Sequence, residues 1–592
     1  MSRQVIEAQF STSDGEQLFY RHWPAQGDKP RGVIVLFHRG HEHSGRMAHV
    51  VDELDLPDFA FYAWDARGHG RSPGVRGFSP SFGRSVRDVD EFVRHAAAQS
   101  GVALADVGVV AQSVGAVLVS TWVHDYAPDI RCMSLASPAF KVKLYVPLAV
   151  PGLALMHKLR GNFFVNSYVK AKFLTHDPAR IASYDSDPLI TRPISVNILL
   201  ALYQAAERVV SDAGAIHVPT QLLISGADWV VHHGPQHAFF DGLGSRIKER
   251  HVLDGFFHDT LGEKDRHLAI ARLRGFLLAR FAEAPQRPAL LDAHKSGYSY
   301  DEYKRLEQPL SVFNPKRWVF AISRLSMATL GRLSEGVRLG LSTGFDSGST
   351  LDYVYRNEAR GVGFVGRLFD RNYLDAIGWR GIRQRKLHVE QLLQWAIGQL
   401  RAAGQPVHVL DIAAGHGRYI LEGIAQLPQQ PDSVLLRDYS PLNVEKGNAL
   451  IAAKGMQGVA RFVAGNAFER ASLSGLSPRP TVAVVSGLYE LFPDNALLRD
   501  SLAGLADAVP EGGYLVYTGQ PWHPQLEFIA RVLSSHRDGK PWVMRRRVQA
   551  EMDQLVEAAG FSKLQTLSDE WGIFSVSVAQ RVAPQVAQRR AD

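Results

Sequence analysis

Three residues that lie far apart in the chain have the types and the order needed for nucleophilic hydrolysis. Ser113 comes directly after an aliphatic run, and Asp228 and His258 each follow a later aliphatic run. In such an arrangement the serine hydroxyl attacks a carbonyl carbon, the histidine takes up the proton, and the carboxylate orients the imidazole. We therefore predict that Ser113, His258 and Asp228 cleave an acyl ester.

The residues around Ser113 are small, as a sharp turn between a strand and a helix requires. The segment Ala111-Gln112-Ser113-Val114-Gly115 fits the pattern G-x-S-x-G, with alanine in place of the first glycine. A larger side chain would clash inside the turn, which holds the serine backbone in a strained conformation. Asp254 is a rival acid, but it lies too close before His258 on the same strand end.

A second group of residues has the pattern of a nucleoside-binding turn. A strand-like run ends at Asp411 and leads into Gly415-His416-Gly417, after which a helix-like run begins. Glycines let the backbone approach a ligand closely, and a helix start offers free N–H groups. Asp438 ends the next strand-like run, about 20 residues further on, where an acidic side chain can accept both hydroxyls of a ribose.

Short aliphatic runs alternate with helical stretches in both halves of the chain, and these elements must position the residues above. Such runs are typical of buried parallel strands joined by helical crossovers. The predicted fold class is α/β, with two doubly wound three-layer αβα domains. The predicted boundaries are 1–282 for the first domain with a cap at about 140–214, 283–316 for a linker, 317–400 for a helical extension, 401–581 for the second core and 582–592 for a frayed tail.

The first half resembles the monoacylglycerol lipases and related lysophospholipases over about residues 15–282. The resemblance rests on HRGHEHSGR from His38, DARGHGRS from Asp65, the turn at Ser113, and the segments GADWVV and GFFHDTLGE. It implies an α/β-hydrolase fold with a helical cap, and an oxyanion hole made of the backbone N–H groups of Gly40 and Val114. Arg39 departs from the family, which has glycine there.

Two features of this half leave alternatives open. Either the loop tolerates arginine at position 39, or Arg39 reaches an anionic headgroup. The cap contains an apolar run at 144–156 with lysine and arginine near it. It either contacts a lipid-like substrate at an anionic interface or buries its apolar face as an ordinary cap helix does.

The second half resembles the class I S-adenosylmethionine-dependent methyltransferases over about residues 340–580. The glycine turn corresponds to the first motif of that family, and three later strand-like runs correspond to the motifs that follow. The resemblance implies a Rossmann-like fold, S-adenosyl-L-methionine as the cofactor, and the helical extension closing over it. The implied cofactor-binding residues are Asp411, Ala413, Gly415, Gly417, Asp438, Tyr439, Asn466, Ala467 and Ser486, and the candidates for contact with the methyl acceptor are Tyr489 and Glu490.

A Rossmann domain for NAD is the main rival for this half. It requires G-x-G-x-x-G, but the third glycine is absent after Gly417, and an acidic residue precedes the turn, which favours the methyltransferase. The segment 361–366 spells that pattern, but it follows a polar run and is not expected to bind a nucleotide. Arg380, Arg383 and Arg385 either bind an acceptor phosphate or coat a helix.

The composition indicates a globular protein with a basic surface. The chain of 592 residues is too long for one core and has a formal net charge of +7. The densest basic run, MRRR at 544–547, is expected to form a solvated surface. His41 and His43 flank Glu42 without the H-E-x-x-H spacing, so no metal is expected. The single cysteine, Cys132, and the absence of a signal-like or membrane-spanning run favour a cytoplasmic protein that can contact the inner membrane peripherally.

The expected function is that of a bifunctional enzyme. A serine hydrolase would act on a small-molecule or lipid-like ester, and an S-adenosylmethionine-dependent methyltransferase would act on an acceptor that the sequence does not identify. One alternative is that one domain, more readily the hydrolase, is a silent binding module. Another is methylation of RNA or DNA, but no nucleic-acid partner is expected, because no nucleic-acid-binding motif is present and SGLYEL stands where amino methyltransferases have N/D-P-P-Y.

Overall fold

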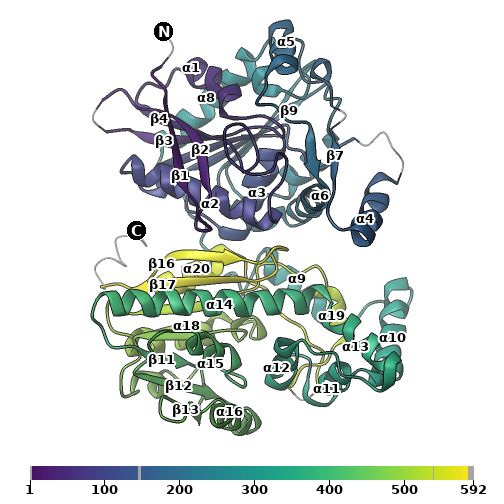
Figure 1. Ribbon diagram of the computed structural model, residues 1–592, viewed down its shortest axis with the longest axis vertical. Helices are drawn as coiled ribbons and strands as arrows, with labels where there is room; N and C mark the ends of the chain where they lie inside the picture. The colour runs from purple at the N-terminus through teal and green to yellow at the C-terminus, as the bar shows by residue number, and fades with distance from the viewer. Residues whose placement is uncertain (1–2, 28, 144–147, 168, 538, 584–592) are drawn as a thin grey trace. The chain divides into compact units, whose positions relative to one another are not determined.

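The computed structural model describes residues 3–27, 29–143, 148–167, 169–537 and 539–583. The chain divides into two units, Met1–Pro288 and Ala289–Asp592, and each has a sheet of its own (Figure 1). Most of the predicted tail, from residue 584 on, and residues 144–147 of the predicted apolar run lie outside the described residues.

The first sheet is built mainly from the predicted aliphatic runs, in the order β1-β2-β4-β3-β5-β6-β9-β10. The strands from β4 to β10 pair in parallel, whereas β1 and β2 form an antiparallel edge. β1 alternates polar and apolar residues, and β2 mixes aromatic with basic residues, so aliphatic runs do not mark this edge in the sequence. The bounds are β1 Ile6–Ser11, β2 Gln17–Trp23, β3 Gly32–Phe37, β4 Phe59–Trp64, β5 Val107–Gln112, β6 Cys132–Ala136, β9 Thr220–Ser225 and β10 Lys248–Leu253.

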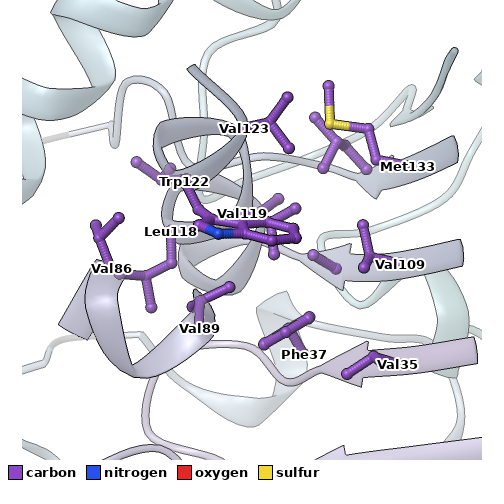
Figure 2. Packing of buried hydrophobic residues seen from close by; sticks show 14 of the residues in the cluster. Val35, Phe37, Val86, Val89, Val109, Leu118, Val119, Trp122, Val123 and Met133 are labelled. Atoms are coloured by element: carbon purple, nitrogen blue, oxygen red, sulfur yellow. The ribbon is translucent and has the colours of Figure 1, made fainter. Parts of the chain in front are cut away.

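Helices cover both faces of this sheet, and their apolar sides form two cores. On one face, Val119 and Trp122 of α3 pack with Val89 of α2 against Phe37 and Val109 of the central strands (Figure 2). On the other face, α1 and α8 pack against the same strands. The helices are α1 Ala48–Leu54, α2 Phe82–Gln99, α3 Val114–Tyr126, α7 His233–Gly242 and α8 His267–Ala282, with the short 3-10 helices η1 Ser44–Met47, η2 Leu104–Asp106, η4 Ala213–Ala215 and η5 Thr260–Gly262.

The predicted cap lies between β6 and β9. Its helix α6 buries Leu202 and Val209, but α4 buries no residue, and Leu159 on it is 75% exposed. For α4 the structure therefore favours the interpretation of the apolar run as a contact surface over that of a helix that buries its own apolar face. The cap elements are α4 Ala149–Arg160, β7 Phe164–Asn166, η3 Ala171–Phe173, α5 Pro178–Ser186, β8 Pro193–Ser195 and α6 Val196–Ser211.

The second sheet has the order β13-β12-β11-β14-β15-β17-β16, with β17 antiparallel to both of its neighbours. The chain reverses its direction of strand addition at β11, and such a switch point in an open sheet is where a crevice for a ligand forms. The bounds are β11 His408–Asp411, β12 Ser433–Asp438, β13 Ala460–Ala464, β14 Val482–Val485, β15 Tyr514–Gly519, β16 Phe561–Ser568 and β17 Ser575–Arg581.

Helices flank the second sheet, and the long α14 packs against β15 and β17 (Figure 1). The predicted linker 283–316 contains helix α9, whose Ser299 accepts a hydrogen bond of 2.9 Å from Arg545, so this part of it is packed structure of the second unit. The helices are α9 Tyr298–Glu307, α10 Pro315–Ala328, η6 Leu330–Leu333, α11 Glu335–Thr343, α12 Gly348–Arg356, α13 Gly363–Leu374, α14 Ile377–Ala402, α15 Arg418–Ala425, α16 Pro441–Ala453, α17 Arg470–Ser474, η7 Tyr489–Leu491, α18 Asn495–Ala508, α19 Leu526–Val532 and α20 Gln549–Ala558. In the described ranges, no helix has the length and apolarity needed to cross a bilayer.

The basic run at 544–547 is buried, so its prediction as a solvated surface is wrong. Arg545 forms an ion pair with Glu551, and Arg546 forms one with Glu302 of α9. Arg547 donates to the backbone oxygens of Tyr489 and Phe492, at 2.7 Å each. Burial lowers the pKa of Arg547 to about 9. These arginines hold loops of the second unit together and are unavailable to an outside partner.

Candidate functional sites

Ser113 lies in the turn between β5 and α3, in a conformation that is rare for a residue with a side chain. Its φ of +55° and ψ of −116° are strained for serine. A side chain at Gly115 would lie 2.5 Å from the backbone oxygen of His38, and Ala111 is fully buried in β5. The small residues around Ser113 therefore have the steric reason that the sequence predicts.

The three predicted hydrolase residues lie in one hydrogen-bonded chain. Ser113 Oγ is 2.7 Å from His258 Nε2, and His258 Nδ1 is 2.7 Å from Asp228 Oδ2. Asp228 and His258 follow β9 and β10, which are neighbouring strands with their carboxyl ends at the same edge. The rival acid, Asp254, is exposed at the end of β10.

The backbone and the imidazole keep Asp228 ionised. Its Oδ1 accepts hydrogen bonds from the N–H groups of Val230 and Val231. Burial pushes the pKa of Asp228 upward, but the attraction of His258 and these hydrogen bonds outweigh it, so the pKa lies below its usual value. A charged, fixed carboxylate of this kind orients an imidazole and stabilises its protonated form.

A cavity of about 780 Å³ opens above Ser113; we call it the hydrolase cavity. Gly40, Val114 and His258 line it beside the serine. Val114 is the first residue of α3, so its N–H has no acceptor inside the helix and can serve a ligand. The rest of the wall is largely apolar and comes in part from the cap: Leu148, Leu153, Met156, Val165, Ile194, Ile198, Leu199 and Leu202.

Arg39 is held by carboxylates inside the protein. It donates two hydrogen bonds to Glu42, of 2.9 and 2.5 Å, and lies 3.6 Å from Asp259. Burial opposes its charge, but Asp259 and Glu42 outweigh the burial and raise the pKa of Arg39. Of the two alternatives left by the sequence, this arrangement favours a structural arginine over a headgroup contact.

Asp259 and Arg180 are parts of this network that sequence reasoning missed. Asp259 follows His258 directly and accepts hydrogen bonds from Gln112 and from Arg180 of the cap. Gln112 directly precedes Ser113, and Asp259 directly follows His258. Through Arg180, the network therefore connects these two neighbouring residues to the cap. Its only signal in the sequence is the acidic residue after the histidine in GFFHDTLGE.

His43, which follows Glu42, has hydrogen-bond partners within the protein. His43 Nε2 is 2.9 Å from Asp187 of the cap, and its Nδ1 accepts a hydrogen bond from Gly45. Burial lowers the pKa of His41 to about 4. Within the described ranges, no group of three histidine, cysteine or acidic side chains is arranged to hold a metal.

The second unit has a crevice of about 820 Å³ beyond the carboxyl ends of β11, β12 and β14; we call it the cofactor crevice. Gly415 and Gly417 have φ of +57° and +75°, and a side chain at Gly417 would lie 2.4 Å from Leu436. Both glycines are therefore required for the turn. The following helix, α15, begins at Arg418 and leaves free N–H groups toward the turn.

Asp438 lies at the end of β12, with both carboxylate oxygens fixed. Its Oδ2 accepts a 2.9 Å hydrogen bond from Gly415 N–H, and its Oδ1 accepts from Ser440 N–H and Asn443 Nδ2. The carboxylate thus holds the glycine turn while it lines the crevice. Tyr439 beside it is 81% exposed, which leaves its ring free to cover a ligand.

The other predicted cofactor residues lie around the same crevice, with one exception. The helical extension adds a further wall from the end of α11 to α12, where Ser349 lies 3.3 Å from His416. The predicted residues that line the crevice are Ala413, Gly415, Gly417, Asp438, Tyr439, Asn466, Ala467 and Ser486.

The exception is Asp411, which is buried beneath the turn. It accepts hydrogen bonds from Ala413 N–H and from the Tyr419 hydroxyl, at 3.1 and 2.5 Å. Burial raises the pKa of Asp411 to about 7, against the lowering effect of these bonds. Its prediction as a direct cofactor contact is therefore not supported, and its contacts show that it braces the loop.

The two predicted acceptor contacts do not line the crevice. The Tyr489 side chain lies in the core and bonds Ser501 through its hydroxyl, so its prediction as an acceptor contact is wrong. Glu490 lines a neighbouring cavity of about 260 Å³, where it pairs with Arg385 at 3.1 Å.

The three predicted arginines do not form a phosphate site. Arg380 stacks on the ring of Trp571, and Arg383 donates to the backbone oxygen of Leu374. Arg385 is buried against Glu490.

Comparison with protein-family models gives two matches along the chain. Residues 28–265 match the model described as "Serine aminopeptidase, S33", and residues 273–581 match the model described as "Putative methyltransferase". The first model lies within the first unit, and the second begins in α8 of the first unit and covers most of the second unit. The fold is thus an α/β-hydrolase fold followed by a Rossmann-like methyltransferase fold.

The known proteins that the chain is similar to include a relative over nearly the whole chain and others over its first half. The chain is 59% identical to "Uncharacterized protein YnbC" of Escherichia coli (strain K12), over 97% of this chain and 98% of that protein. It is 26% identical to "Monoacylglycerol lipase" of Mycolicibacterium smegmatis, over 46% of this chain and 97% of that protein. It is 27% identical to "Monoglyceride lipase" of Homo sapiens, over 42% of this chain and 81% of that protein. Because the second model covers more than half of the chain, the chain belongs to the family that this model describes as "Putative methyltransferase", and it carries in addition a hydrolase domain related to the monoglyceride lipases.

Proposed function

We propose that the chain is a bifunctional enzyme in which Ser113 hydrolyses a lipid-like ester and the second unit transfers a methyl group from S-adenosyl-L-methionine. The observation that carries the hydrolase half is the hydrogen-bonded chain from Ser113 through His258 to Asp228, at the base of an apolar cavity. His258 takes the proton from Ser113 as its oxygen attacks the ester carbonyl, and the N–H groups of Gly40 and Val114 stabilise the oxyanion that forms. His258 gives the proton to the leaving alcohol, which leaves the acyl group on Ser113. A water molecule, deprotonated by His258, then attacks this acyl group, releases the carboxylic acid and restores Ser113.

The cavity favours an ester with one long acyl chain. Its walls are aliphatic side chains from the core and from the cap, and it is large enough for such a chain. The related lipases act, by their names, on monoacylglycerols or monoglycerides. We extend that substrate class to this chain as part of the proposal.

Labelling with a fluorophosphonate tests the hydrolase half, because the probe requires an activated serine. We expect the full chain to be labelled at Ser113 and to hydrolyse a monoacylglycerol. Ser113→Ala should lose both, whereas Ser186→Ala, at an exposed serine of the cap, should retain both. A wild-type chain that resists the probe and turns over no ester would leave the first unit as a binding module.

The methyltransferase half is supported by the glycine turn and by the carboxylate of Asp438, both of which face the cofactor crevice. Asp438 and Tyr439 would hold the ribose and adenine side of the cofactor, and the turn would face its methionine side. The cofactor supplies an activated methyl group when bound, and the chain contributes mainly alignment with the acceptor.

Titration calorimetry with S-adenosyl-L-methionine tests this half. We expect binding to the wild-type chain and to Asp507→Ala, which removes a surface carboxylate that pairs with Arg470. Asp438→Ala should bind much more weakly. Absence of binding by the wild-type chain would contradict the proposal.

The proposal includes peripheral contact of helix α4 with an anionic membrane. Leu155 and Leu159 are 59% and 75% exposed, and Lys158 and Arg160 lie on the same helix. Apolar side chains among cations suit an anionic lipid surface. Leu155→Glu with Leu159→Glu should reduce flotation with phosphatidylglycerol vesicles, and unchanged flotation would contradict this contact.

A further inference from the structure

The cavity that contains Glu490 adjoins the cofactor crevice; we call it the aromatic pocket. Asp346, Leu351, Gly487 and Leu491 line both spaces. Gly487 has no side chain, and one placed there would lie 3.0 Å from the guanidinium of Arg385. The two spaces therefore meet at Gly487, where a molecule in the pocket could face a cofactor in the crevice.

Large aromatic side chains form much of the pocket wall, which favours a flat ligand. Aromatic rings gain most by stacking or edge contact with other rings. An apolar cavity of 150 Å³ holds one benzene ring, so about 260 Å³ corresponds to roughly two fused rings. The aromatic side chains are Tyr373, Trp379, Phe528, Trp542 and Phe574.

Several N–H donors at this pocket lack acceptors. In the part of the chain that the structure describes, Arg385 Nε, Gln520 Nε2 and Trp542 Nε1 are buried without a hydrogen-bond partner. Arg385 and Gln520 are themselves almost fully buried. A ligand that accepts hydrogen bonds in this pocket would satisfy all three donors at one place.

His523 adds a fourth donor to this pocket. Its Nδ1 accepts a 3.0 Å hydrogen bond from Gln525 N–H, so a neutral ring carries its proton on Nε2. Burial lowers the pKa of His523 to about 3, which keeps the ring neutral near pH 7. The pocket therefore presents hydrogen-bond donors, which favour a ligand with acceptor oxygens.

The charges in the pocket decide between a carboxylate and a neutral oxygen. The guanidinium of Arg385 is already paired with Glu490, at 3.1 Å. An anionic ligand would bury a second negative charge beside Glu490 without a cation of its own, which is costly. A neutral carbonyl oxygen accepts the same hydrogen bonds without that cost.

From these contacts we infer that the aromatic pocket binds the methyl acceptor, and that this acceptor is a small, uncharged, flat molecule of about two fused rings bearing carbonyl-type oxygens and a hydroxyl group. The hydroxyl oxygen would form the bond to the methyl carbon as the bond from the sulfonium sulfur breaks, and the hydroxyl proton would be released to solvent. The role as acceptor rests on the proposed methyltransferase function. The ligand class rests on the pocket itself and can be tested without the cofactor.

Binding of three matched probes to the full chain tests the ligand class: 1-tetralone, which has a carbonyl; tetralin, which lacks it; and 1-naphthoate, which is an anion. We expect 1-tetralone to bind at least tenfold more tightly than either of the others. Gln520→Leu and Trp542→Phe should each weaken it about three- to tenfold, as expected for loss of one hydrogen bond. Gln405→Leu and Trp318→Phe, which change the same residue types at exposed positions, should leave it unchanged.

Separate titration of S-adenosyl-L-methionine into each variant keeps the two proposals distinguishable. Unchanged cofactor affinity in Gln520→Leu and Trp542→Phe would show that the second unit is folded. The inference is overturned if no probe binds, if tetralin or 1-naphthoate binds as tightly as 1-tetralone, or if neither variant weakens the binding. Failure of cofactor binding alone would instead refute the proposed methyltransferase function.

Discussion

Replacing Arg39 with alanine separates the two roles that an arginine beside the active serine could have. In the structure Arg39 is 4% exposed and donates two hydrogen bonds to Glu42, which is 1% exposed. Removing one partner of a buried ion pair typically costs about 3–5 kcal/mol, because the other charge remains buried without compensation. Arg39→Ala should therefore destabilise the first unit.

The neighbouring cations place the expected loss at the lower end of that range. Arg46 still lies 3.3 Å from Glu42, and Arg180 still donates to Asp259 at 2.6 Å. A loss of about 3 kcal/mol changes the equilibrium constant of unfolding by roughly 100-fold. With a urea dependence of about 3 kcal/mol per molar, the midpoint should fall by about 1 M.

Fluorophosphonate labelling at increasing urea concentrations measures this unfolding selectively, because the proposed target, Ser113, belongs to the first unit. Arg71→Ala is the matched control: Arg71 pairs with Glu7 at the surface, where an ion pair contributes at most about 1 kcal/mol. Adding Glu42→Gln to Arg39→Ala should recover part of the lost stability, since it neutralises the stranded carboxylate.

A different result would refute the structural role of Arg39. If Arg39→Ala loses labelling at the same urea concentration as wild type, Glu42 does not depend on Arg39. If, in addition, Arg39→Ala loses activity toward esters with anionic headgroups but keeps its activity toward other esters, Arg39 contacts the substrate.

Three further predictions concern the proposed sites. Asp228→Asn should lower kcat for ester hydrolysis by about 10³–10⁴, because His258 loses its orienting carboxylate; a loss below tenfold would contradict that role. Asp438→Ala should weaken binding of S-adenosyl-L-methionine at least tenfold in calorimetry, because the change removes the ligand contact and the hydrogen bond from Gly415. Unfolding of the second unit, followed by tryptophan fluorescence in urea, should become easier as the pH rises from about 4 to about 7, because folded Asp411, with a pKa of about 7, keeps a proton that the unfolded chain releases near pH 4. The loss should amount to about 4 kcal/mol, and Asp411→Asn should remove this pH dependence; an unchanged slope would show that Asp411 is not its source.

The sequence by itself determined the parallel strands and the residues at their ends. Short aliphatic runs ending at Ser113 and Asp438 give strands whose carboxyl ends meet at one edge, and glycine at 415 and 417 indicates a turn that no other residue forms easily. These signals are local, because each depends on residues adjacent in the chain. Chain order then sufficed to bring Asp228 and His258 to Ser113.

Only the tertiary structure decided which charged side chains are buried and which are exposed. The sequence around Arg545 and Arg546 predicts a solvated basic surface. In the structure both side chains are buried, because Arg545 pairs with Glu551 of α20 and Arg546 pairs with Glu302 of α9. Likewise, Tyr489 and Glu490 are adjacent in the sequence, but the side chain of Tyr489 lies in the core and that of Glu490 lines the aromatic pocket. The partner of Arg546, Glu302, lies far away in the chain, and no local pattern contains that information.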